Sequence, residues 1–249
     1  MEQNLFLIHK TKTLSNVFEI LDELSFKCFY SLEHIREENF IESSVLDIAI
    51  PMISFSDINF PSKLNDEYGH YAFVMKKEWA VKNGITPVLY LEKKSDGMRL
   101  LNSIEYLISR MLNLTRESDL PLSKTVKDLQ KYFISYLQFI KNYKHEDWKE
   151  KKLEPNYCFY EEREWRYVPI DENDCSFVKF IHKEKDYDRE KEMLNRKANQ
   201  YVLNFTLDDL AYLILDKEQD KSLLEDFFKN HDRDYETLDN KILFFDELN

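Results

Sequence analysis

Two glutamates separated by a single residue, Glu162 and Glu164, are the side chains of this sequence that most directly suggest chemistry. They lie in segment 159–168, where aromatic and β-branched residues are interspersed with charged ones and which Pro169 closes. This pattern predicts a β-strand, in which alternate residues share a face. Two carboxylates at such positions are about 7 Å apart and repel each other unless something neutralises or uses them. The spacing is therefore a reason to expect a site on this strand.

The same segment also fits an ordinary surface strand. An edge strand is protected from aggregation by charged side chains, and here Arg166 would pair with Glu164, and Arg163 with Glu161. In that interpretation the glutamates are solvated and have no functional role. The sequence alone leaves both interpretations open.

Other polar side chains stand where the predicted strands could bring them to a site. His9 ends the apolar run 5–9, and Ser54 and Ser56 share one face of the apolar segment 48–58. A hydroxyl in such a strand either satisfies neighbouring backbone groups or lines a cavity that needs polar contacts. A lone histidine at a strand end is more often satisfied by backbone than used as a ligand. These residues therefore have a structural as well as a functional interpretation.

Gly69, one of only three glycines, lies between Tyr68 and Tyr71. A glycine here predicts a turn or a close approach of two backbone segments just before a strand at 71–75. The two tyrosines could present flat rings to a planar ligand, or they could belong to the core.

Composition argues against several classes of protein. The chain has 249 residues and a net charge of −12, so general binding to DNA or RNA, which needs clustered cations, is not expected. Neither GxGxxG nor GxxxxGKS/T occurs, which removes the main support for standard dinucleotide and P-loop sites. Cys28, Cys158 and Cys175 are far apart, so we expect a reducing compartment, no disulfide and no metal site. Without a basic leader or an apolar run of about 18 residues, a cytoplasmic protein without membrane contact is expected.

The order of periodic segments predicts an α+β fold formed by a single domain over residues 1–249. Pro51 cannot donate a ladder hydrogen bond, so its strand is expected to start at or after it. Between about 98 and 152 the pattern changes to long helices with a break at 119–121, which indicates an inserted helical hairpin; segment 141–154 is interpreted as a solvated connector. The aromatic stripe of the hairpin is assigned to the core or to a partner interface. Strands are expected at 5–9, 26–30, 51–58, 71–75, 87–91, 159–168, 200–205, 211–215 and 242–245, and shorter helices at 15–24, 79–83 and 223–230.

Several of these segments together resemble one family. An opening strand that ends in His9 and Thr11 is followed by segments 51–58, 68–71, 77–79 and 83–90, a helical insertion, and segment 159–169. The most specific parts are the block from Tyr-Gly-His-Tyr to Pro-Val-Leu-Tyr and the strand Glu-Arg-Glu-Trp-Arg. Over nearly the whole chain, this order resembles the bacterial abortive-infection family AbiGi, described as the antitoxin of a phage-resistance pair.

A second resemblance is to the ADP-ribosyltransferase-like fold, in which small mixed or antiparallel sheets hold NAD between them. His9, Tyr71 (or Tyr68) and Glu164 follow one another in the order of that fold's site residues, and Glu162-Arg163-Glu164 is similar to its Glu-x-Glu pattern. This sequence has Ser-Phe-Ser at 54–56 where one branch has Ser-Thr-Ser, and no arginine where that branch expects one on the first strand.

The second resemblance implies NAD as cofactor and a role for each candidate residue. Glu164 would hold the ribose and stabilise the positive charge that develops when the nicotinamide glycosidic bond breaks, and Glu162 would orient or deprotonate the acceptor. The residues that contact the cofactor would be His9, Thr11, Ser54, Tyr68 and Tyr71. The substitution Glu164→Gln would then stop NAD turnover and leave the thermal midpoint nearly unchanged.

Two functions from different classes follow from these resemblances. The first is a defence protein with an ADP-ribosyltransferase-like site that binds NAD. The second is a non-catalytic antitoxin whose acidic surface neutralises a basic partner; that partner would be a cognate toxin, or a phage or host protein. In a third, purely structural interpretation, Glu162 and Glu164 are solvated and serve no function.

Overall fold

The computed structural model describes residues 5–35, 46–58, 60, 68–116, 123–149, 152–169, 179–181, 184–231 and 235–248. Within these residues the chain has an α+β fold built on a nine-stranded sheet of order β15-β14-β5-β1-β4-β11-β6, with β3 and β12 also paired to β4. All pairs in this sheet are antiparallel except β14 with β15. The strands are β1 (Phe6–Thr11), β3 (Phe29–Ile35), β4 (Leu46–Ser56), β5 (Tyr71–Lys76), β6 (Thr86–Pro87), β11 (Glu164–Tyr167), β12 (Lys179–Ile181), β14 (Leu210–Leu215) and β15 (Ile242–Phe244).

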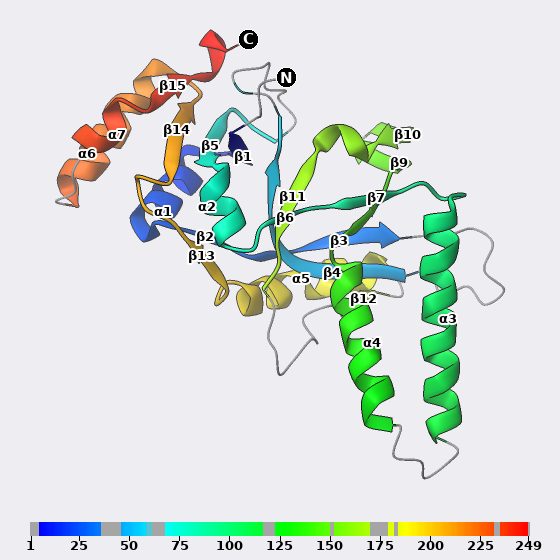
Figure 1. Ribbon diagram of the computed structural model, residues 1–249. Helices are drawn as coiled ribbons and strands as arrows, with labels where there is room; N and C mark the ends of the chain where they lie inside the picture. Colours follow the sequence, from blue (N-terminus) through cyan, green and yellow to red (C-terminus); the bar gives the residue numbers. More distant parts are fainter. Residues whose placement is uncertain are drawn as a thin grey trace.

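Three two-stranded pairs and the helices complete the fold (Figure 1). The pairs are β2 (Ser25–Lys27) with β13 (Val202–Asn204), β7 (Leu89–Leu91) with β8 (Ile140–Asn142), and β9 (Lys144–Lys149) with β10 (Lys152–Cys158). The helices are α1 (Leu14–Glu23), α2 (Lys77–Lys82), α3 (Asp96–Arg116), α4 (Ser123–Leu137), α5 (Glu184–Ala198), α6 (Glu218–Asn230) and α7 (Glu236–Asp239), with 3₁₀ turns at Phe159–Glu162 and Phe245–Glu247. Among the residues described, no helix is both long and apolar enough to cross a bilayer.

The two faces of the large sheet carry different side chains. Residues paired across an antiparallel ladder point to the same face, so the pairs Ile8 with Ser56, Glu164 with Ser56, and Arg166 with Ser54 place these residues on one face. The other face carries the largest apolar cluster, which includes Leu7, Phe55 and Phe73 from the strands and buried residues of α1, α2, α5, α6 and α7.

The helical hairpin packs on the face that carries Glu164. At its base, Met98 and Leu101 of α3 and Leu137 of α4 bury against Ile48, Ile50 and Met52 of β4. Beyond this base, α3 and α4 extend away from the sheet side by side (Figure 1). The predicted hairpin is therefore confirmed for Asp96–Arg116 and Ser123–Leu137, whereas the break at 119–121 lies outside the described residues.

Most of the other predicted elements are confirmed. Thr13 caps α1 and accepts a hydrogen bond from the Asn16 backbone N–H. Gly84 follows α2 with a φ of +73°, which suits the residue after a helix end. At Gly69, with a φ of +100°, an added Cβ would stand 2.5 Å from the Thr11 carbonyl oxygen, so the expected close backbone approach is present.

The segment around the two glutamates is only partly the predicted strand. Residues Phe159–Glu162 form a 3₁₀ turn, and Arg163 adopts a left-handed conformation with a φ of +44° that breaks the extended chain. The strand begins at Glu164. Glu162 and Glu164 are therefore not two residues of one continuous strand face, and the distance expected from period two does not apply.

Two further predictions are wrong. Segment 141–154 is not a solvated connector, because its described residues belong to β8, β9 and the start of β10. Lys141 of β8 has only 13 % of its side chain exposed. Pro51 lies inside β4, opposite Tyr30. Tyr30 donates its N–H to the Asn195 side chain, and its carbonyl oxygen accepts a hydrogen bond from the Tyr187 hydroxyl. The ladder therefore does not require the N–H that proline lacks at this position.

Candidate functional site

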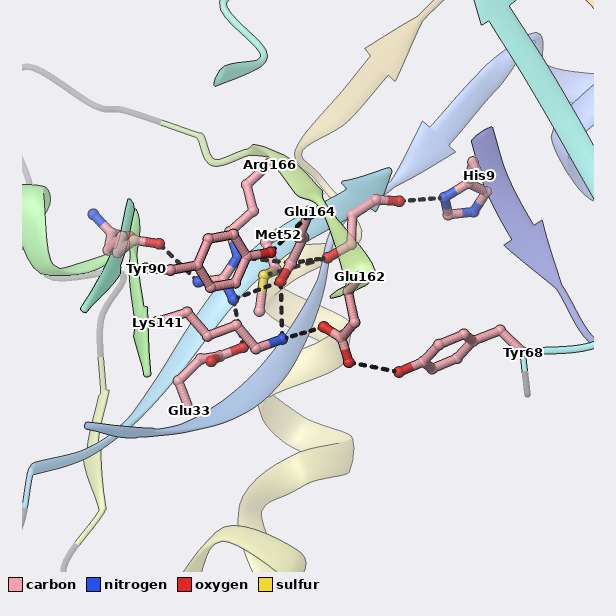
Figure 2. A network of polar contacts seen from close by, with 11 residues as sticks. His9, Glu33, Met52, Tyr68, Tyr90, Lys141, Glu162, Glu164 and Arg166 are labelled. Carbon is pink, nitrogen blue, oxygen red and sulfur yellow. Dashed lines mark hydrogen bonds and ion pairs between the residues drawn. The ribbon is translucent and has the colours of Figure 1, made fainter. Parts of the chain in front are cut away.

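A fully buried arginine, Arg166, is the centre of a network of charged side chains on the face of the large sheet that the helical hairpin covers (Figure 2). Its Nε and Nη2 atoms donate to both carboxylate oxygens of Glu164, at 2.7 and 3.0 Å. Nη2 also donates to Glu33 at 2.7 Å, and Nη1 donates to the Gln138 carbonyl oxygen at 3.0 Å. The guanidinium thus joins β11 to β3 and to the residue that follows α4.

Glu164 receives a hydrogen bond at each of its acceptor sites. Besides the two from Arg166, Ser54 donates its hydroxyl at 2.7 Å and Lys141 donates its ammonium at 2.9 Å. A carboxylate has about four lone-pair sites, and four donors occupy them. The backbone N–H of Glu164 is also used, because it donates to the Tyr90 hydroxyl at 2.8 Å.

Lys141 connects the buried pair of Glu164 and Arg166 to the more exposed residues of the network. Its Nζ lies 2.7 Å from Glu162 and 2.9 Å from Glu164, and 4.8 Å from the ring centre of Phe159. Glu162 in turn accepts a hydrogen bond from the Tyr68 hydroxyl at 3.3 Å. Tyr68 is 43 % exposed, so the network runs from a buried arginine to a partly solvated tyrosine.

Burial and charge act in opposite directions on these groups. Burial alone would raise the pKa of Glu164, but Arg166 and Lys141, with hydrogen bonds from Arg166 and Ser54, hold it well below its usual range. Burial opposes the charge on Lys141, yet Glu164, Glu33 and Glu162 raise the pKa of this ammonium well above its ordinary value. The pKa of Arg166 is likewise raised by Glu164 and Glu33 against the effect of burial. Glu164, Lys141 and Arg166 are therefore charged at neutral pH.

The network contains four of the predicted site residues. Ser54, Glu162, Glu164 and Tyr68 meet in it, and the expected pairing of Arg166 with Glu164 is confirmed, although the pair is buried rather than on a surface strand.

The remaining predicted residues lie on the opposite face of the sheet. His9, Thr11 and Tyr71 share the face of Leu7 and Phe73, because His9 pairs with Phe73 and Thr11 with Tyr71. His9 touches the network only through a 2.9 Å contact between its Nδ1 and the Ser54 carbonyl oxygen. Its ring packs against Phe26 and Phe55, and burial lowers its pKa.

Thr11 and Tyr71 have partners of their own away from Glu164. Thr11 accepts a hydrogen bond from the Asn16 side chain at 2.8 Å, and Tyr71 donates to Asp220 at 3.0 Å. Burial, followed by this bond, raises the pKa of Tyr71 to about 12. The sheet therefore separates these two residues from the carboxylates with which they were expected to act.

Sequence reasoning missed Glu33, Lys141 and Gln138. Glu33 lies in a strand more than 130 residues from Arg166, and Lys141 lies in a segment that is mostly charged. No local pattern distinguishes a buried charge from a solvated one, because its partners come from distant parts of the chain. A weak signal was available in the glutamate pair itself, which needs cations nearby.

The arrangement holds β3, β11 and the residue that follows α4 together. Glu164 has no acceptor site left for a ribose hydroxyl, and the predicted NAD contacts lie on two faces of one sheet. The residues present do not fit NAD in the predicted manner. Within the described part of the chain, no cluster of three His, Cys, Asp or Glu side chains could hold a metal ion.

Comparison with known proteins places the chain in one group. Residues 26–216 match the family model described as "Putative abortive phage resistance protein AbiGi, antitoxin". A curated relative from Lactococcus lactis subsp. cremoris, named abortive phage resistance protein AbiGi, is 26 % identical over 231 residues, covering 80 % of this chain and 87 % of the relative. No solved structure matches the chain.

Proposed function

Because this chain belongs to the AbiGi family of abortive phage resistance proteins, we propose that it acts in phage defence as an antitoxin. In this proposal it works in the cytoplasm and neutralises a toxin by binding it, without chemistry of its own. The family description names an antitoxin, and the charge of −12 suits binding to a basic toxin.

The hydrogen bonds that Glu164 accepts favour an antitoxin over an enzyme. A catalytic carboxylate must offer a lone pair to its substrate, but four protein donors between 2.7 and 3.0 Å occupy those of Glu164. The carboxylate is also buried, with only 6 % of the residue exposed. It therefore supports the fold on which a binding surface can be displayed.

Deleting this gene alone tests the antitoxin proposal. If the neighbouring gene encodes the toxin, the single deletion should reduce colony number by several orders of magnitude, and a plasmid copy of this gene should restore it. Deleting both genes together is the control and should leave growth unchanged. Normal growth of the single deletion, with the neighbouring gene shown to be expressed, would refute the proposal.

The ADP-ribosyltransferase-like site with NAD stays a prediction, and calorimetry tests it. Because His9 and Glu164 point to different faces of the sheet, we expect no saturable heat when NAD is titrated to millimolar concentration into the folded protein. Saturable binding that His9→Ala weakens, with nicotinamide release that Glu164→Gln stops, would instead establish an enzyme.

A further inference from the structure

Helix α3 carries two apolar stripes, of which only one is buried. Met98, Leu101 and Ile108 are buried. The second stripe consists of residues spaced four, three, four and three apart, each between 41 and 64 % exposed: Leu100, Ile104, Leu107, Met111 and Leu114. This spacing is that of the a and d positions of a heptad repeat, which form the seam of a coiled coil.

Helix α4 has the same division. Val126 and Leu137 are buried, whereas Leu129, Tyr132 and Tyr136 are between 46 and 69 % exposed. Their spacing of three and four again follows one side of a helix. Each helix of the hairpin thus contributes one side to the core, which is one of the two roles predicted from sequence, and exposes another side.

The two exposed stripes lie on the same side of the hairpin. With 3.6 residues per turn, the stripe of α3 lies roughly 110° around the helix from its buried line, and that of α4 lies roughly 100° from its own, in the same rotational sense. The helices run in opposite directions, so rotations of the same sense bring both stripes to one side. Leu100, Ile104, Leu107, Met111, Leu114, Leu129, Tyr132 and Tyr136 therefore form one surface, the hairpin face.

The hairpin face differs from the rest of the hairpin surface. None of its eight residues is charged, and neither is Thr125, which points the same way on α4. At the base of α3, Asp96 points the same way and pairs with Arg99. The opposite side carries Asn102, Asn113 and Lys127, together with the exposed Tyr106. A set of eight neighbouring large apolar side chains on one side is typical of an interaction surface rather than of scattered exposed residues.

We propose that the hairpin face binds an amphipathic helix of the toxin, a proposal that rests on the antitoxin function proposed above. An amphipathic helix laid along two antiparallel helices buries its apolar side through anchors at intervals of three and four residues. The heptad spacing of the α3 stripe offers matching positions to such a helix. The flanks of this one helix should be acidic, whereas the acidic remainder of this chain would meet basic parts of the toxin.

The charge of the hairpin supports an acidic helix and argues against a second copy of this chain. α3 and α4 contain six Lys or Arg and three Asp or Glu, a net charge of +3 in a chain of −12. Helical spacing places Arg110 and the Arg99–Asp96 ion pair on the outer edge of α3, and Lys124, Asp128 and Lys131 on that of α4. Each edge therefore has a net positive charge. Two hairpins packed face to face would bring like charges together, which disfavours the wrong partner, whereas Asp or Glu flanks would meet these cations.

Two synthetic helices with the same leucine seam, one flanked by Glu and the other by Lys, test this chemistry in fluorescence anisotropy with the full chain. We expect the Glu-flanked helix to bind at least tenfold more tightly. Leu107→Glu should weaken that binding at least tenfold, as expected for a central contact. Asn113→Glu adds the same charge to the opposite side of α3 and should change it by less than about twofold.

Three results would overturn the hairpin proposal. The first is equal binding of the Glu-flanked and Lys-flanked peptides. The second is equal binding of the Glu-flanked peptide by Leu107→Glu and Asn113→Glu. The third is a dimer of the chain alone, detected by light scattering, that Leu107→Glu dissociates. The last would assign the hairpin face to a second copy. Circular dichroism checks that Leu107→Glu is folded, and Leu107→Ser serves as a second variant without the added charge.

Complementation of the gene deletion separates this proposal from the antitoxin function. Asn113→Glu should restore growth and Leu107→Glu should not. If wild type and Leu107→Glu restore growth equally, the antitoxin function holds and the hairpin proposal is wrong. If the deletion has no phenotype, the antitoxin function is wrong, and the peptide titrations still decide whether the hairpin face binds an acidic helix.

Discussion

Replacing Arg166 by methionine should lower the free energy of unfolding by about 3–5 kcal/mol, the usual cost of removing one partner from a buried ion pair. Methionine fills much of the same space but leaves Glu164 and Glu33 buried without the guanidinium that binds both. Such a loss is a large fraction of the roughly 5–15 kcal/mol that stabilises a typical domain. Urea denaturation should show a lower midpoint with an unchanged m-value.

Arg196→Met is the matched control for this prediction. Arg196 also pairs with a glutamate, Glu192, but its side chain is 76 % exposed, so its loss should cost about 0–1 kcal/mol. Equal midpoints for the two variants would mean that the buried network contributes no more than a surface ion pair. A double-mutant cycle of Arg166→Met with Glu33→Gln should be non-additive, because the two residues are in direct contact.

The residues of the network show which features a local sequence pattern can predict and which it cannot. The segment around Trp165 is apolar and aromatic enough to predict a strand, and Glu164–Tyr167 is one. The break at Arg163 was not predictable, because a left-handed conformation is rare for arginine and nothing in the neighbouring sequence requires it. The 3₁₀ turn ends at Glu162, which accepts a hydrogen bond from Lys141.

Long, periodic segments were the easier part of the fold. The helices of the hairpin were predictable because their apolar residues recur every three or four positions over several turns. Lys141 was misassigned because short strands such as Ile140–Asn142 give too few residues to show a period. The arrangement of His9 and Ser54 on opposite faces depends on strand register, which a single-residue shift reverses and which the sequence alone does not specify.

Glu164→Gln should be strongly destabilising at neutral pH, contrary to the unchanged midpoint that a catalytic role implies. The amide keeps the shape but removes the charge that Arg166 and Lys141 share, so we expect a loss of about 3 kcal/mol or more. Its exposed neighbour provides the control: Glu161→Gln should change the urea midpoint little. A urea midpoint equal to that of wild type at pH 7, together with loss of nicotinamide release, would instead indicate that Glu164 is catalytic.

The pH dependence of this loss identifies its electrostatic origin. The pKa of Glu164 is lower in the folded protein than its ordinary value of 4.5, so as the pH falls the unfolded chain binds the proton first. The stabilisation is therefore fully present above about pH 5 and is lost as the pH falls through the ordinary value toward the folded one. Other carboxylates affect wild type and variant alike, so the difference in unfolding free energy between them should shrink from pH 6 to pH 3. A difference that stays constant over this range would mean that the amide acts through packing, and that the charge of Glu164 does not hold the network together.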